Sequence, residues 1–317
     1  MGLATAFGPT FFFRVILPGI VFAVAVQPLS AWLYAALGLE GVYGLSRGSL
    51  LAATAITIGL ILAAASRSVY YLFEGFSWPA LTERLRRRTL RRVQTLATRQ
   101  AELATKGRGS HGLTRLEHVE AMRIAEKLRD VPVVIGPEGP RYELDRPTVL
   151  GNLIASYELY PTSRYGIDGE FYLPHAVNLA PEGVQLDLDQ SEAMADGMVL
   201  SCFGMLVAAV AHGLVLLGVV VGGVLTRLGL GPLVLGPERA GQSITYAAVA
   251  SAAALLFYRL SLAAHRTYGR KIRTVTDMVA PKLVEMAKGP LPTSAERHAL
   301  QQRREYLETL EPPHRSS

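Results

Sequence analysis

The chain has 317 residues, of which 50% are hydrophobic and 18% are charged, and its formal net charge is +6. This balance excludes an ordinary soluble domain. It favours an integral membrane protein whose basic residues flank its spans and do not bind nucleic acid. The only cysteine, Cys202, lies inside an apolar stretch, which excludes an intrachain disulfide and a zinc site built from a CxxC motif.

Four stretches are apolar and long enough to cross a bilayer as helices, since about 20 helical residues span the hydrocarbon core. They cover residues 12–37, 49–73, 197–225 and 244–264. The third is the clearest, because residues 198–225 contain no Asp, Glu, Lys or Arg. Pro18 and Pro28 predict a kink or a broken end in the first.

Lysine and arginine are distributed unevenly around these spans. The connections inside each hairpin are short and nearly uncharged, whereas arginines gather after the second and fourth spans. Because cytoplasmic loops carry the excess of Lys and Arg, both termini and the long insert are predicted to be cytoplasmic. The sequence predicts a mainly all-α membrane protein: transmembrane hairpins at 1–74 and 197–265, a mostly helical cytoplasmic insert at 75–196 and a helical cytoplasmic tail at 266–317.

Three ionisable residues inside the predicted spans are candidates for a functional role. Arg67 and Arg259 occupy similar depths in the second and fourth spans, where they can either snorkel to the headgroups or line an ion path. His212, inside the third span, either forms a hydrogen bond to a neighbouring helix or has a functional role.

Small residues at a spacing of four also recur in the third span. Ala209 precedes Gly213 by four positions, and Gly218 precedes Gly222 by four. This spacing lets helix backbones approach closely. We expect these glycines to mediate helix packing, either within the chain or between subunits.

The insert is predicted to open with a helical hairpin. Its first helix covers 79–105 and carries an apolar face among many arginines, so it either lies on anionic lipid or packs in a bundle. The capping box Thr114-x-x-Glu117 begins the second helix, which extends to Arg129. The apolar run at 131–135 is short enough for a strand.

A dense polar and aromatic run follows at 151–175. Six of its side chains are candidates for either a structural polar network or a ligand site. They are Asn152, Glu158, Tyr160, Arg164, Tyr165 and Asp168. From Tyr165 to Gly197 there are seven acidic residues and no Lys or Arg. These acids either pair with the arginine-rich helix of the insert or form a vestibule that attracts cations.

The same run resembles the pattern GN-x5-E-x-YP-x-x-RYGID of a family of uncharacterised bacterial multi-pass membrane proteins. The matching positions are Gly151, Asn152, Glu158, Tyr160, Pro161 and 164–168, and the Glu74-Gly75 pair is also similar. The family has Trp-Pro-Arg after the run, where this chain has Leu173-Pro174-His175. The resemblance implies a multi-pass protein of the bacterial plasma membrane, and it implies no activity.

No motif for a nucleotide-binding loop, metalloprotease, serine hydrolase or kinase is present, and the histidines show no ligand spacing. The chain is therefore predicted not to be an enzyme and to hold no cofactor or metal. Two hypotheses are retained. One is a homo-oligomeric membrane protein with a cytoplasmic sensing or gating domain, with an ion channel as one output. The other is a membrane-anchored scaffold that recruits a cytoplasmic protein partner.

Overall fold

The computed structural model describes residues 8–36, 47–77, 79–109, 112–136, 139–142, 146–166, 169–227 and 237–287. This part of the chain is almost entirely helical, as predicted. Its β structure is one small antiparallel hairpin, in which β1 (Val133–Gly136) pairs with β2 (Gly139–Tyr142). The strand expected at 131–135 is thus confirmed.

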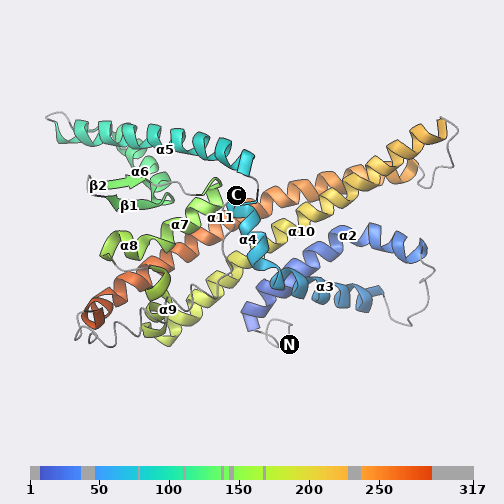
Figure 1. The fold of residues 1–317 in the computed structure, drawn as a ribbon, viewed down its shortest axis with the longest axis horizontal. Coiled ribbons are helices and arrows are strands. Elements are labelled where there is room, and N and C mark those ends of the chain that lie inside the picture. Colours follow the sequence, from blue (N-terminus) through green and yellow to red (C-terminus); the bar gives the residue numbers. More distant parts are fainter. Residues whose placement is uncertain are drawn as a thin grey trace, which may run out of the picture.

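The helical elements follow one another in chain order (Figure 1). They are the π-helical turn η1 (Phe12–Ile16), α2 (Leu17–Ala36), α3 (Arg47–Ala64), α4 (Ser66–Glu74), α5 (Pro79–Arg108), α6 (Arg115–Arg129), α7 (Val149–Glu158), α8 (Tyr160–Tyr165), α9 (Gly169–Leu179), α10 (Glu182–Arg227) and α11 (Pro237–Ala287).

Two very long helices, α10 and α11, pack side by side and form the axis of the molecule (Figure 1). They have 46 and 51 residues, and both continue without a break through the predicted region boundaries at 196 and 265. The α2–α3 pair packs against one end of this axis, and the insert elements cover the other end. A core cluster that includes Leu150, Ile154, Leu200 and Ile272 joins α7 to both long helices.

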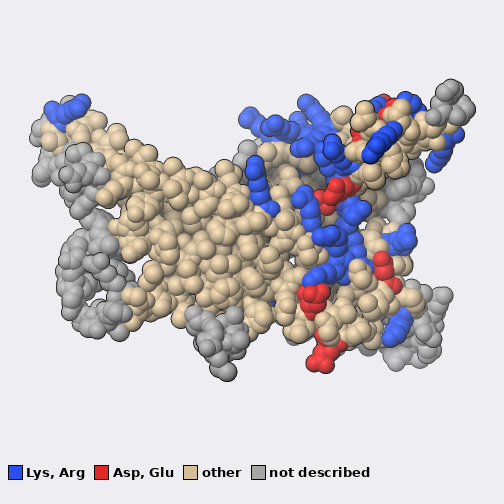
Figure 2. Space-filling view, turned by 180° about the vertical axis from the view of Figure 1, so that it is seen from behind, with Lys and Arg blue, Asp and Glu red and all other residues tan. Residues whose placement is uncertain are grey.

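Three helical stretches are long and apolar enough to cross a membrane. They are Gly8–Leu29, Glu182–Val224 and Ala240–Lys282. A fourth exists if the pair Leu51–Ala64 and Ser66–Glu74 counts as one span, although the two helices meet at an angle of 61°. The second predicted span is therefore bent, at Ala65. On the face shown in Figure 2, one half of the molecule is almost free of charged side chains and the other half is rich in them.

Close helix contacts occur at Gly19 and Gly59, two glycines outside the spacing pattern predicted on the third span. A Cβ on Gly19 of α2 would collide with the carbonyl oxygen of Ala55 in α3. A Cβ on Gly59 of α3 would collide with the carbonyl oxygen of Val15. Without a side chain at either position, the backbones of α2 and α3 can touch, which is the usual way for helices to associate in lipid.

The predicted glycine face of α10 is not used in this way within the described chain. A Cβ added to Gly213 would meet nothing within 4 Å, and Gly218 is exposed. Gly222 is half-buried. Of the two uses left open for this face, close packing within the described chain is not seen at Gly213 or Gly218, and contact between subunits stays a prediction.

The helical hairpin of the insert packs as a bundle. Val93 and Leu103 of α5 are buried against Ile124 and Leu128 of α6. The predicted capping box is present: the backbone N–H of Glu117 donates to Oγ1 of Thr114, and the backbone N–H of Thr114 donates to the carboxylate of Glu117. The apolar face of α5 is thus used within the insert, while its arginines between 84 and 92 are exposed.

Candidate functional site

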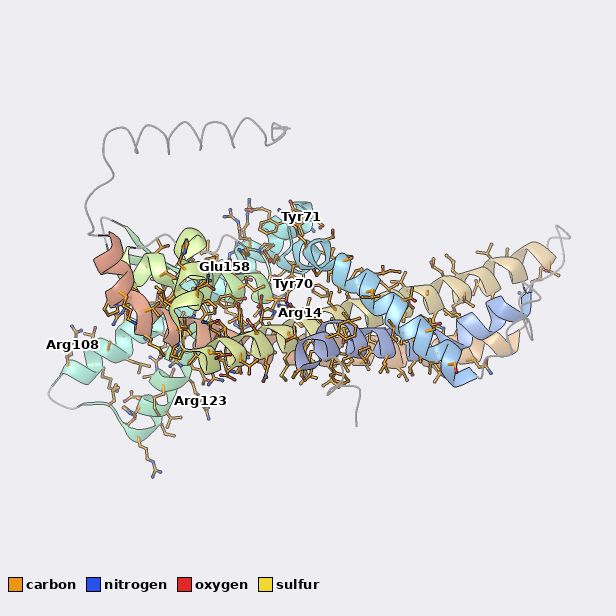
Figure 3. The ribbon with its side chains drawn as sticks, turned by 90° about the horizontal axis from the view of Figure 1, so that it is seen from below. Arg14, Tyr70, Tyr71, Arg108, Arg123 and Glu158 are labelled. Carbon is orange, nitrogen blue, oxygen red and sulfur yellow. The ribbon has the colours of Figure 1, made fainter. Side chains whose placement is uncertain are left out.

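Five polar side chains from five different elements meet where the apolar and charged halves of the molecule join. They are Arg14 of η1, Tyr70 of α4, Tyr157 of α7, Asp196 of α10 and His265 of α11. Figure 3 shows Arg14 and Tyr70 close together near the middle of the long axis. We call this set the junction chain, because it links the first membrane helix to the insert.

The junction chain is continuous. Arg14 Nε donates to Asp196 Oδ2 at 2.7 Å, and the Tyr70 hydroxyl donates to Asp196 Oδ1 at 2.6 Å. The Tyr70 oxygen lies 3.2 Å from His265 Nε2, and His265 Nδ1 lies 3.2 Å from the Tyr157 hydroxyl. Glu192, one turn before Asp196 on α10, adds a second carboxylate 3.2 Å from Arg14 Nη2.

Donor and acceptor rules give the junction chain one direction. An ionised carboxylate can only accept, so the Tyr70 hydrogen points to Asp196, and the Tyr70 oxygen must accept from His265 Nε2–H. In neutral histidine the other nitrogen is then an acceptor, which the Tyr157 hydroxyl satisfies. Every hydrogen therefore points from α7 towards Asp196, and His265 is held in a single tautomer.

The end of the junction chain formed by His265 and Tyr157 is buried from solvent. His265 is 3% exposed and Tyr157 is 5% exposed. Their rings are stacked with centroids 6.4 Å apart, and Tyr157 also makes an edge contact with Tyr268 at 5.4 Å. Burial raises the pKa of Tyr157 well above its ordinary value, so its hydroxyl keeps the hydrogen that it donates.

The absence of a side chain at Gly269 makes room for the Tyr157 ring beside His265. A Cβ on Gly269 would lie 2.6 Å from Cδ1 of the Tyr157 ring. The ring can therefore lie directly on the backbone of α11, one turn after His265. This close approach sets the distance between α7 and α11 and brings the hydroxyl to the imidazole.

Asn152 and Glu158 both bind Arg146, whereas the prediction grouped them with Arg164. Glu158 pairs with Arg146 at 2.6 Å, and Arg146 also pairs with Glu74 at 3.2 Å. Asn152 Nδ2 donates to the carbonyl oxygens of Arg146 (2.6 Å) and Thr148 (2.8 Å). This group ties the end of α4 to the segment before α7 and to the last residue of α7, Glu158. Arg164 is exposed on α8 and is not among the partners of Arg146, Glu158 or Asn152 in the described residues.

The two tyrosines of the run form a second, separate group. The hydroxyls of Tyr160 and Tyr165 both donate to Asp277 Oδ1 of α11, at 2.8 and 2.7 Å. Asp168 lies outside the described residues. The described side chains of the run thus lie in two separate groups, and both connect elements of the insert to neighbouring helices.

The intramembrane candidates fall in two environments. Arg67 and Arg259 are exposed on α4 and α11. His212 is 1% exposed, its Nε2 lies 3.1 Å from the carbonyl oxygen of Ala25, and its ring stacks on Tyr246. The predicted bond from His212 to a neighbouring helix is thus present, and it reaches the backbone of α2.

The acidic residues before the third span pair differently from the prediction. Asp187 pairs with Lys271 of α11 at 2.7 Å, and Asp196 and Glu192 pair with Arg14. The expected partners were the arginines of α5. One signal in the sequence does point to the real pair: Arg14 is the only Lys or Arg before Arg47, and Asp196 is the acid nearest to the third predicted span.

Comparison of the chain with protein-family models, with curated proteins and with solved structures gave no match. The resemblance to a bacterial membrane family therefore stays a prediction that depends on the motif alone.

Proposed function

We propose that the chain is a homo-oligomeric, four-span protein of the bacterial plasma membrane whose cytoplasmic insert senses a signal and gates an ion pathway. The observation that carries this proposal is the junction chain. Its five side chains connect α7, in the insert, to Arg14, in the first membrane helix. A signal that displaces α7 would act first on the bond between Tyr157 and His265.

The topology in this proposal counts the bent α3–α4 pair as one span. Four spans return the chain to the side on which it started, so both termini and the insert lie on one side of the membrane. The exposed arginines of α5 and the basic residues of α11 after His265 support the cytoplasmic side, because Lys and Arg are retained there. The apolar half of the surface supplies the contact with the lipid bilayer.

The junction chain suits a sensing role because its parts depend on one another. In a buried network the loss of one partner leaves a neighbouring polar group unsatisfied, which costs about 1–3 kcal/mol. A movement of α7 that broke one bond would therefore favour rearrangement of the next. At its Arg14 end, the junction chain reaches a π-helical turn of the backbone. Such local irregularities are frequent at functional sites.

The scaffold hypothesis receives less support. It relied on the tyrosine-rich run as a surface for a cytoplasmic partner, but the hydroxyls of Tyr160 and Tyr165 are bound to Asp277. The scaffold hypothesis stays the alternative, and an absence of ion flux through the purified protein would favour it.

Labelling of single cysteines tests the topology. In a Cys202→Ser background, we place one cysteine at Gln242, at the start of α11, and one at Thr98, on α5; both positions are exposed. A membrane-impermeant maleimide added to intact cells should label Gln242→Cys and leave Thr98→Cys unlabelled until the cells are opened. The reverse pattern would contradict the orientation, and labelling of both sites in intact cells would contradict four spans.

Ion flux tests the gating role. Purified protein in liposomes should conduct, and Tyr157→Phe should change that flux several-fold because it removes the hydroxyl that His265 accepts from. Tyr165→Phe is the matched control, since it removes a hydroxyl that donates to Asp277 and lies outside the junction chain. No flux from the wild-type protein would favour the scaffold. Equal changes in the two variants would argue against a special role for the junction chain.

A further inference from the structure

A cleft of about 290 Å³ opens beside Tyr157, between α6, α7 and α11. Its lining residues are Glu126, Lys127, Arg129, Asp130, Leu153, Tyr157, Arg266, Gly269, Arg270 and Arg273. Five of these are basic and two are acidic, so the walls carry a net charge of +3. The floor is apolar and aromatic, because Leu153 and Tyr157 are at most 5% exposed. The shape is a small pocket with a hydrophobic base and cationic sides.

The positive charge of this cleft is only partly compensated from within the protein. Arg266 pairs with Asp130 at 2.7 Å. Arg273 is held instead by neutral oxygens, since its Nη2 donates to Ser156 Oγ at 2.9 Å and to the carbonyl oxygen of Arg129 at 3.1 Å. Its Nε is buried and has no hydrogen-bond partner within the described part of the chain. These bonds hold the Arg273 guanidinium in place where the residue lines the pocket.

Guanidinium and ammonium groups converging on one small space favour a phosphate. Arginine matches the geometry of phosphate oxygens with several donors at once, and lysine adds a compact charge. A volume near 300 Å³ is at the lower end for small-molecule sites, which suits a phosphate with its immediate substituent. A neutral or cationic ligand would leave the walls unpaired.

The predicted fourth span ends at residue 264, so the cleft lies just past the predicted membrane boundary on α11. Arg266 directly follows His265. Arg270 and Arg273 lie about 8 and 12 Å beyond His265 along the helix axis, at 1.5 Å per residue. The headgroup layer is about 5–8 Å thick on each side of a bilayer. The cleft thus begins at headgroup level and extends into the cytoplasm, within reach of both lipid and soluble phosphates.

We propose that this cleft binds the phosphate of an anionic ligand, carried either by a phospholipid headgroup or by a soluble phosphorylated compound. Because Tyr157 belongs to both the cleft floor and the junction chain, the ligand would be the signal that the insert senses. Only this last step rests on the proposed gating function. Binding itself does not.

Two binding measurements on the purified full chain test the site. Native mass spectrometry counts bound phosphatidylglycerol against phosphatidylcholine, and calorimetry in neutral detergent measures inorganic pyrophosphate. The test variant is Lys127→Glu/Arg270→Glu, because both side chains are exposed and line the cleft. The control Arg108→Glu/Arg115→Glu makes the same charge change at exposed positions outside it. Figure 3 shows Arg108 at the far tip of α5.

We expect the test variant to lose at least tenfold in affinity for a probe that the wild type binds, and the control to stay within twofold. Loss in the lipid measurement alone assigns the site to a headgroup, and loss in the pyrophosphate measurement alone assigns it to a soluble compound. The milder pair Lys127→Gln/Arg270→Gln should show a smaller loss and guards against misfolding of the reversal variant. The proposal is overturned if neither probe binds the wild type, or if test and control variants bind equally.

The binding measurements and the ion-flux measurement test different parts of the proposal. If the phosphate binds and Tyr157→Phe leaves ion flux unchanged, the site stands and the proposed coupling fails. If Tyr157→Phe changes flux while neither probe binds, the coupling stands and the phosphate site fails.

Discussion

Asp196 is the position where a conservative change should be most informative. Its carboxylate accepts from Arg14 Nε at 2.7 Å and from the Tyr70 hydroxyl at 2.6 Å. Asp196→Asn keeps the size of the side chain but leaves one acceptor oxygen for two donors, and its amide hydrogens then face one of those donors. Arg14 and Tyr70 cannot both stay satisfied.

The size of the effect follows from the number of bonds and their exposure. A hydrogen bond to a charged group contributes about 1.5–3 kcal/mol, and one of the two is lost. The side chain of Asp196 is 19% exposed and that of Arg14 is 35% exposed, so water and Glu192 recover part of the loss. We therefore expect about 2 kcal/mol of destabilisation. Glu192→Gln should cost less than about 1 kcal/mol, because Glu192 is 42% exposed and its ion pair is nearer to a surface pair.

Thermal unfolding in one detergent, with both variants measured side by side, is the assay. At roughly 2–4 °C per kcal/mol, Asp196→Asn should lower the midpoint by about 4–8 °C and Glu192→Gln by much less. A cycle with Arg14→Gln should show non-additivity of about 1 kcal/mol between Arg14 and Asp196, as expected for residues in contact. A larger shift for Glu192→Gln than for Asp196→Asn, or a strictly additive cycle, would refute the importance assigned to Asp196.

Three further predictions concern packing, assembly and pH. Gly59→Ala should markedly lower the yield or melting midpoint, because its Cβ collides with the backbone of η1, whereas Gly213→Ala has open space and should leave both unchanged or improved. Gly218→Leu should lower the oligomeric order seen by native mass spectrometry if the exposed face of α10 contacts another subunit; an unchanged oligomer would assign that face to lipid. Burial, then the bond to Asp277, raises the pKa of Tyr160 from 10 to about 12. The folded state thus gains stability from neutral Tyr160 that is complete below pH 10 and lost as pH rises towards 12, so the melting midpoint of the wild type should fall more steeply across this window than that of Tyr160→Phe.

The sequence predicted those features of the fold that depend on local pattern. The apolar stretches predicted the membrane helices, since hydropathy over about 20 residues is a strong local signal. The capping box at Thr114 and Glu117 correctly located the start of α6. The bend at Ala65 was missed because neither proline nor glycine lies at the break.

The candidate site was largely beyond sequence analysis because its contacts are long-range. Arg14 and Asp196 are 182 positions apart, and Tyr70 and His265 are 195 apart. No helical period connects such residues, and each alone reads as an ordinary boundary residue. The motif at 151–168 attracted attention through its density of polar groups, yet the side chain that joins the junction chain is Tyr157, which the motif pattern leaves unspecified.

The π-helical turn at 12–16 has a consequence for how this chain can change in evolution. A π turn contains roughly one residue more than an α turn, so it behaves as a one-residue insertion that the helix has absorbed. Deleting one residue just after Arg14 would restore a regular α-helix. Everything before the deletion would then rotate by about 100° relative to α2, the angle that one residue occupies in an α-helix. Homologues that lack the extra residue should therefore present a different residue to Asp196, and a gap at this point in an alignment would mark members of the group that have lost this ion pair.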